Sequence, residues 1–171
     1  TIPKSKSGKS IMITSCYKNE GETYASSNIS IQLSNLGYKV ILVGGDLRNP
    51  DLGKNFDFNS FSFPGLTDII DDNTKSFDEL LNKFLIKYEK LDILNSGLQK
   101  DGNMNYFSNK RFNHLVSFLK QKYDYIVFDT APIIPVVDTL DLLDSLDFVI
   151  HTFRNNFSNR KYCDVVLNYK K

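Results

Sequence analysis

The chain has 171 residues, of which 41% are hydrophobic and 24% are charged, and its formal net charge is +1. A chain of this size and composition can bury a core without disulfide or metal support, so we expect one domain over residues 1–171. A net charge so close to zero does not favour nucleic acid as a partner. Two cysteines, Cys16 and Cys163, are too few for a disulfide framework and favour a reducing compartment.

The sequence carries neither a long apolar run that could span a membrane nor a signal peptide. It begins at Thr1 rather than at a methionine. We therefore expect a domain excised from a longer, membrane-associated protein.

Short apolar runs predict strands that are buried on both faces, as in a parallel sheet. They are residues 11–15, 39–44, 91–94, 125–129 and 148–153.

Segments with helical periodicity separate these runs. At 21–36 the apolar stripe is Ala25, Ile29, Leu33 and Leu36, and at 109–123 it is Phe112, Leu115, Val116, Leu119 and Tyr123. Residues 77–88 form a fair helical pattern, and 136–146 and 159–168 form weaker ones. Strands that alternate with helices predict an α/β sandwich of three layers, with a mostly parallel central sheet flanked by helices.

Two irregular segments are expected at the rim of this sheet. Residues 51–64 hold four phenylalanines among polar residues, and we expect Phe56 and Phe63 to pack into the core. Residues 95–106 are predicted to form a second loop on the same rim. Ligands of such folds bind at the carboxyl ends of the strands, where these loops lie.

The segment between the first strand and the first helix has the outline of a phosphate-binding loop, in which a small residue and four others precede Gly-Lys-Ser/Thr. Cys16 is the small residue, Gly21 is the glycine, and Thr23 stands at the hydroxyl position that normally reaches Mg²⁺. Glu22 occupies the lysine position. The candidate nucleotide-binding residues are Cys16, Lys18, Asn19, Glu20, Gly21, Glu22, Thr23 and Tyr24.

Two later stretches add specificity to this loop. Residues 40–50 end in Gly-Gly-Asp-Leu-Arg-Asn-Pro, and residues 123–132 end in Asp-Thr-Ala-Pro. Together with the loop they resemble the bacterial tyrosine kinases (BY-kinases) that regulate capsule and exopolysaccharide assembly. The Walker A loop of that family ends in Glu-Gly-Lys-Ser/Thr, its Walker A′ strand in Asp-x-Asp-Leu-Arg-x-Pro, and its Walker B strand in Asp-Thr-x-Pro.

The resemblance implies a P-loop NTPase-like fold and assigns roles to three residues. Asp46 and Asp129 would be the residual catalytic carboxylates. Thr23, Asp46 and Asp129 would be the ligands of any Mg²⁺. The phosphoacceptor stays unknown, because Tyr162 and Tyr169 do not form the tyrosine cluster that the family carries.

The departures from the family pattern are Glu22 for the Walker A lysine, Gly44 for the first Walker A′ aspartate, and Lys18 where proline is frequent. Two unit charges about 5 Å apart interact by about 3 kcal/mol at an effective dielectric of about 20. Changing attraction into repulsion therefore shifts phosphate binding by about 6 kcal/mol, or about four decades of affinity. As the first residue of a helix, Glu22 is expected to be tolerated without penalty once ATP is no longer a ligand.

These departures favour a pseudokinase that needs no cofactor and serves as a structural or regulatory module in polysaccharide export. The resemblance implies a homo-oligomer at the cytoplasmic face of the bacterial inner membrane, joined to or paired with a transmembrane chain-length regulator. One alternative is an active tyrosine autokinase that uses ATP and Mg²⁺, with Lys18 or a neighbouring subunit supplying the missing charge. Another is a deviant-Walker partitioning-type ATPase, although Lys18 is one position away from the lysine of that group and no Gly-Gly follows.

The remaining candidates carry less weight. Cys16 is either a thiol activated by the helix N-terminus or simply a small loop residue. His114 and His151 lack cysteine or histidine partners at ligand spacing, so we do not expect them to bind a metal.

Overall fold

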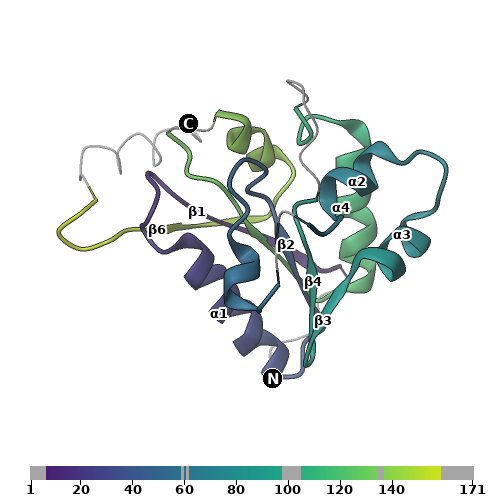
Figure 1. Cartoon of the computed structure of the whole chain (residues 1–171), viewed down its shortest axis with the longest axis horizontal. Coiled ribbons are helices and arrows are strands. Elements are labelled where there is room, and N and C mark those ends of the chain that lie inside the picture. The colour runs from purple at the N-terminus through teal and green to yellow at the C-terminus, as the bar shows by residue number, and fades with distance from the viewer. Residues whose placement is uncertain (1–6, 59, 61, 98–104, 135–136, 159–171) are drawn as a thin grey trace.

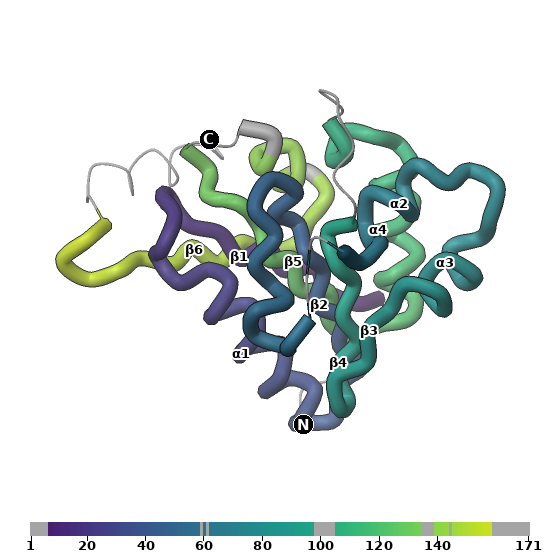
Figure 2. The backbone as a smooth tube through the Cα atoms, viewed as in Figure 1, coloured from purple at the N-terminus to yellow at the C-terminus, as the bar shows by residue number. Residues whose placement is uncertain are grey.

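The structure, a computed structural model, describes residues 7–58, 60, 62–97, 105–134 and 137–158. Its centre is a six-stranded sheet with the strand order β3-β4-β2-β5-β1-β6 (Figures 1 and 2). The strands are β1 (Lys9–Ser15), β2 (Val40–Gly44), β3 (Ile86–Tyr88), β4 (Leu91–Leu94), β5 (Tyr125–Asp129) and β6 (Phe148–Thr152). Every neighbouring pair is parallel except β3 and β4, which confirms the predicted mostly parallel sheet.

Helices cover both faces of this sheet (Figure 1). They are α1 (Glu22–Asn35), the 3₁₀ helix η1 (Leu52–Asn55), α2 (Leu66–Asp71), α3 (Phe77–Phe84), α4 (Lys110–Lys122) and the 3₁₀ helix η2 (Val137–Asp144). Alternate residues of the strands pack with the α1 and η1 side chains on one face and with those of α2, α3, α4 and η2 on the other. The three predicted layers are therefore confirmed.

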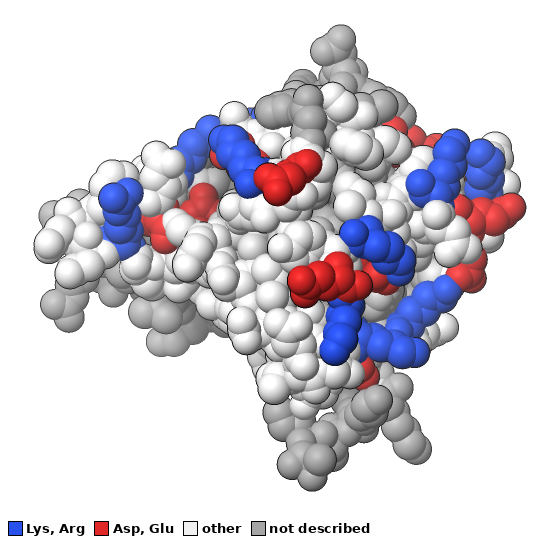
Figure 3. Space-filling view, turned by 60° about the horizontal axis from the view of Figure 1, so that its bottom comes forward, with Lys and Arg blue, Asp and Glu red and all other residues white. Residues whose placement is uncertain are grey.

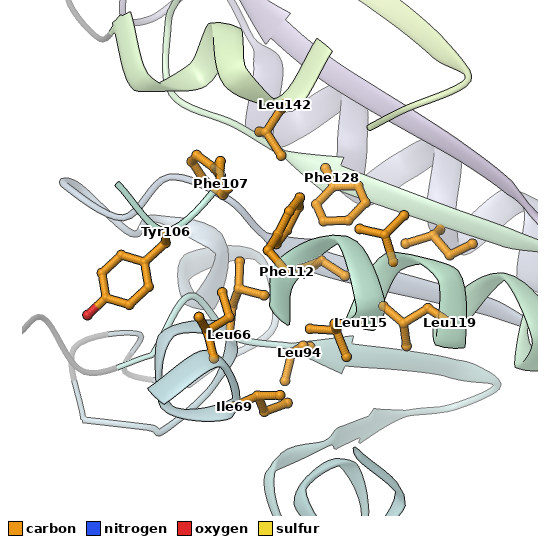
Figure 4. Close-up of a cluster of buried hydrophobic side chains, with 14 of the residues drawn as sticks. Leu66, Ile69, Leu94, Tyr106, Phe107, Phe112, Leu115, Leu119, Phe128 and Leu142 are labelled. Atoms are coloured by element: carbon orange, nitrogen blue, oxygen red, sulfur yellow. The ribbon is translucent and has the colours of Figure 1, made fainter. Parts of the chain in front are cut away.

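The larger core lies between α4 and the sheet (Figure 4). Phe112 of α4 is fully buried and contacts Phe128 of β5 edge to face, with 6.0 Å between the ring centroids. Leu115 and Leu119 extend this contact along one stripe of α4, as the sequence periodicity predicted. Leu142 closes the cluster from η2.

Helix α1 approaches the sheet through serines rather than through large apolar residues. Ser26, Ser27, Ser30 and Ser34 are its buried residues, and the hydroxyls of Ser27 and Ser30 donate to the carbonyl oxygens four residues earlier. Ala25, Ile29 and Leu33 pack at the edge of the smaller core, as predicted. The prediction for Leu36 is wrong, because this residue caps the helix end and is 75% exposed.

Three other expectations are corrected. The helix predicted over 77–88 ends at Phe84, because Ile86–Tyr88 pairs with β4 through a tight turn in which Glu89 has a φ of 51°. The segment 136–146 contains a 3₁₀ helix, and 159–168 lies outside the described residues. Phe56 is buried as predicted, whereas Phe63 is 43% exposed and packs only edge-on against Phe58.

The strand order places the ends of three strands side by side. In register, Asp129 of β5 lies beside Ile13 of β1 and Gly44 of β2. The segments that leave β1, β2 and β5 therefore meet at one edge of the sheet. Among the described residues, no helix is both long enough and apolar enough to cross a membrane.

We expect Phe112→Ala to lower the free energy of unfolding by about 3–5 kcal/mol, because it opens a cavity where the ring of Phe112 meets Phe128. Phe148→Ala is the matched control, since Phe148 is 53% exposed on β6 and its loss should cost less than about 1 kcal/mol. Urea unfolding of both variants checks this. Equal destabilisation would contradict the placement of the core.

Candidate functional site

The loop of residues 16–21 joins β1 to α1 and is held closed by one of its own side chains. The buried carboxylate of Glu20 accepts the backbone N–H groups of Cys16 at 2.8 Å and of Tyr17 at 2.9 Å. Ser158 also donates to this carboxylate from the turn after β6. Glu20 thus holds the loop in place, and its carboxylate oxygens are hydrogen-bonded within the protein.

Two residues of the loop have left-handed backbone conformations. Gly21 immediately precedes α1 with a φ of 93°, and Asn19 has a φ of 70°. Glycine suits position 21, because residues with a Cβ rarely adopt such a φ angle. The carbonyl oxygen of Asn19 accepts a hydrogen bond from the guanidinium of Arg154.

Glu22 is the first residue of α1, and its side chain is half-buried. Its Oε2 atom is buried and has no hydrogen-bond partner among the described residues. Burial raises the pKa of Glu22, and the charges of Glu20 and Asp46 raise it further, although its own backbone and the Ser15 hydroxyl oppose the shift. The expectation that this helix position tolerates Glu22 without penalty is therefore wrong, because desolvation acts against the carboxylate.

Asp129, at the end of β5, is the most deeply buried acid of the site, with 2% of its surface exposed. Ser26 donates to its carboxylate at 3.0 Å. Burial raises the pKa of Asp129 to about 7, against the hydrogen bonds from Ser26 and Thr23 and with the help of the charges on Asp46 and Glu22. The carboxyl group of Asp129 is consequently only partly ionised near neutral pH.

Asp46 lies in the turn after β2 and accepts the backbone N–H groups of Arg48 at 3.0 Å and Asn49 at 2.9 Å. Burial raises the pKa of Asp46, and the positive charge of Lys18 acts in the opposite direction. Lys18 itself is exposed. Its ammonium group is therefore the loop's own cation, and its charge acts on Asp46.

Backbone contacts leave little space beside this turn. The N–H groups of Gly45 and Asp46 both donate to the carbonyl oxygen of Asp129, at 2.6 and 3.1 Å. A Cβ atom built on Gly44 would stand 2.8 Å from the backbone nitrogen of Ser96. A side chain at position 44 would therefore require the backbone around Ser96 to move.

The structure brings four of the predicted residues together at the carboxyl edge of the sheet: Glu22, Thr23, Asp46 and Asp129. Cys16, Glu20 and Gly21 form the loop beside them. Asn19 and Tyr24 are exposed, and they line a pocket of about 190 Å³ together with Gly21, Glu22 and Thr23.

Ser26 and His151 are site neighbours that the sequence analysis missed. Ser26 follows Thr23 by three residues and so shares its helix face, which is a signal that could have identified it. His151 comes from β6, and its Nε2 atom lies 3.5 Å from the Cys16 thiol while its Nδ1 atom faces the carbonyl oxygen of Thr152 at 3.0 Å. Burial lowers the pKa of His151, so its ring is neutral at pH 7. His151 reaches Cys16 because β6 lies beside β1 in the sheet, and no local sequence pattern reveals that strand order.

The charges of the site are unbalanced. Glu20, Glu22, Asp46 and Asp129 are all acids. The charge of Lys18 acts on Asp46, and Lys54 lines the pocket beside Glu22 but pairs with Asp51 at 2.7 Å. Hydroxyl and carboxylate oxygens are the ligand types that Mg²⁺ prefers. In the part of the chain that the structure describes, however, no three acidic, histidine or cysteine side chains converge closely enough to hold a metal ion.

The buried Asp129 should make stability depend on pH. Because its pKa is about 7 in the folded chain and 3.8 without burial, the folded state binds this proton more tightly than the unfolded state does. The free energy of unfolding should therefore fall as pH rises from about 4 to about 7, by up to about 4 kcal/mol.

Asp129→Asn should flatten this dependence, and urea unfolding at several pH values measures it. Asp57→Asn is the matched control, because Asp57 is exposed and asparagine also tolerates its φ of 57°. Parallel pH profiles for the wild type and Asp129→Asn would contradict the assignment.

Comparison with known proteins places this geometry in a family. No family model matches the chain. The tyrosine-protein kinase CpsD of Streptococcus pneumoniae is 31% identical over 125 residues, which are 73% of this chain and 53% of CpsD. The chain thus spans about half the length of this relative.

Solved structures agree with this sequence match. The kinase domain of VpsO superposes with a TM-score of 0.82 and 28% identity over 93% of this chain and 76% of its own. The septum site-determining protein MinD of Pyrococcus horikoshii, at 21% identity and a TM-score of 0.62 over 85% of this chain and 57% of its own, shares the P-loop NTPase fold alone. The chain belongs, as a BY-kinase-like domain, to the family of bacterial tyrosine kinases.

Proposed function

We propose that this domain is a pseudokinase, a module of capsule or exopolysaccharide synthesis and export that binds nucleotide weakly or not at all. The resemblance to BY-kinases gives the cellular context, and one relative, from Klebsiella pneumoniae, is named a putative tyrosine-protein kinase in the cps region. The loop of this domain argues against catalysis, because the acids at the carboxyl edge of the sheet are matched by too few cations.

The buried Oε2 atom of Glu22 is the observation that carries this proposal. It is an acceptor that lacks a donor among the described residues, at the position where the Walker A pattern has lysine. A phosphate oxygen brought to this place would meet a second acceptor rather than an ammonium group. Protonation of Glu22 would weaken the repulsion but would supply no positive charge.

Gly44 supports the same conclusion from a different direction. The family pattern has an aspartate there, whereas the backbone nitrogen of Ser96 now stands 2.8 Å from the position of a Cβ atom. Loss of the aspartate and closure of its space are consistent with a site that no longer holds Mg²⁺ and a triphosphate. The residues present do not fit that group, so we derive no reaction step through it.

An active autokinase is the second candidate, and Lys18 is the observation in its favour. The charge of Lys18 opposes the burial that raises the pKa of Asp46, so its ammonium group acts on one acid of the site. Lys18 is exposed, however. Its ammonium group would have to contact the nucleotide phosphates in place of a lysine at position 22. In this case ATP and Mg²⁺ would be the cofactors, bound through Thr23, Asp46 and Asp129.

Further parts of the proposal concern the whole protein. By analogy with the family, the domain would act at the cytoplasmic face of the inner membrane. Its partners would be a transmembrane chain-length regulator and further copies of itself. Crosslinking in native membranes, followed by identification of the partners, tests this part separately from nucleotide binding.

Titration calorimetry tests the pseudokinase proposal directly. The dissociation constants of the wild type for Mg-ATP and Mg-ADP should be about 1 mM or higher. Glu22→Lys should tighten binding by at least about a hundredfold, because it replaces a repulsion with an attraction. We do not combine it with Gly44→Asp, which would push against the backbone of Ser96.

Glu79→Lys makes the same charge change at an exposed position in the first turn of α3 and should leave nucleotide binding unchanged. Micromolar binding by the wild type, together with transfer of labelled phosphate to tyrosine, would replace the pseudokinase by the autokinase. If Glu22→Lys gains no affinity, or if the control variant gains as much, the electrostatic explanation is wrong.

A further inference from the structure

A cavity of about 550 Å³ lies at the amino edge of the sheet, between the starts of β2 and β4 and the carboxyl end of α4. It is lined by the side chains of Lys39, Lys90, Lys122, Asp92 and Tyr123, among others. This is the opposite edge from the loop of residues 16–21. Its volume is within the range of about 300–1,000 Å³ that small-molecule sites occupy.

Among the described residues, Asp92 is the acid that lines this cavity, and its charge is already paired. The Asp92 carboxylate accepts the hydroxyl of Tyr123 at 2.7 Å and pairs with the ammonium group of Lys87 at 2.6 Å. Lys122 is likewise engaged, with Asp78 of α3. The charged groups at the cavity that remain outside these ion pairs are both lysines.

Lys39 and Lys90 are those lysines. Both are exposed, and neither forms an ion pair within the described part of the chain. Figure 3, which turns this lower side of the molecule forward, shows lysine and arginine side chains gathered around acidic ones. Two unpaired ammonium groups at one cavity provide the charge that a phosphate dianion needs.

The backbone holds both lysines in place. The backbone N–H of Lys39 donates to the Asp124 carboxylate at 2.8 Å, and its carbonyl oxygen accepts the N–H groups of Asp124 and Tyr125. Lys90 sits in the two-residue turn between β3 and β4, directly after the left-handed Glu89. A ligand would therefore have to order two side chains but no loop, which keeps the entropic cost of binding low.

We propose that this cavity binds a small phosphomonoester, such as a sugar phosphate, through the ammonium groups of Lys39 and Lys90. Lys122 and the amide of Gln121 lie on the wall formed by the end of α4, where the amide can meet hydroxyl groups of the ligand. The site is independent of the proposed function, because it shares no residue with the loop of residues 16–21. The same phosphate chemistry could be presented by a free metabolite or by a lipid headgroup.

The experiment uses glucose 1-phosphate and inorganic phosphate as soluble probes, and phosphatidylcholine vesicles with or without phosphatidic acid as the lipid probe. Amide NMR shifts of Lys39 and Lys90 report binding of the soluble probes, and co-sedimentation reports binding to vesicles. We expect saturable shifts with glucose 1-phosphate. Lys39→Gln with Lys90→Gln should weaken binding by about tenfold or more, since it removes two charge-assisted hydrogen bonds.

Lys54→Gln with Lys110→Gln is the matched control, because it removes the same charge from exposed lysines on other elements and should leave binding within about twofold. Glu22→Lys adds a positive charge at the loop but should leave the probe-induced shifts of the Lys39 and Lys90 amides unchanged, which separates this site from the loop at the other edge. Binding of phosphatidic acid vesicles that depends on Lys39 and Lys90 would support the site and identify a lipid source. Absence of saturable binding up to about 10 mM for both probe types, or equal losses in the two double variants, would overturn the proposal.

Discussion

The end of β5 ties three segments of the chain together at one residue. The backbone carbonyl of Asp129 accepts the N–H groups of Gly45 and Asp46 after β2, and its carboxylate accepts the hydroxyl of Ser26 from α1. Asp129 also lies in register with Ile13 of β1. The loop that follows β1, the turn that follows β2 and the start of α1 are therefore positioned by contacts with a single buried acid.

This constraint explains why the acids at this edge are costly to the protein. Burial raises the pKa of Asp129, Asp46 and Glu22, and the charge of Asp46 raises the pKa of both Glu22 and Asp129 further. The protein offsets the charge of Glu20 and Asp46 with its own backbone N–H groups and leaves one oxygen of Glu22 without a described partner. The amino edge of the sheet differs, because its lining acid is paired and two lysines are left over. The two edges of the sheet therefore present opposite charges to a ligand.

The sequence predicted much of this fold, because buried parallel strands and a strongly amphipathic α4 leave clear patterns. It also placed Glu22, Thr23, Asp46 and Asp129 at one edge, since each follows a predicted strand. It failed where tertiary contacts override local preference. Ile86–Tyr88 continues a helical pattern yet pairs with β4, and the serines of α1 have polar side chains yet face the sheet. The orientation of the Glu20 carboxylate toward its own loop, and the approach of His151 to Cys16, depend on distances that spacing does not encode.

The central claim is that an acid at the start of α1 keeps the phosphate chain of a nucleotide away from the loop. The most direct measurement is the nucleotide content of the native protein, purified without added ligand, denatured, and analysed by ion-exchange chromatography with absorbance detection. We predict that the released fraction contains no adenine nucleotide above the background of a sample that lacks the protein. Near-stoichiometric ADP or ATP in that fraction would contradict the account.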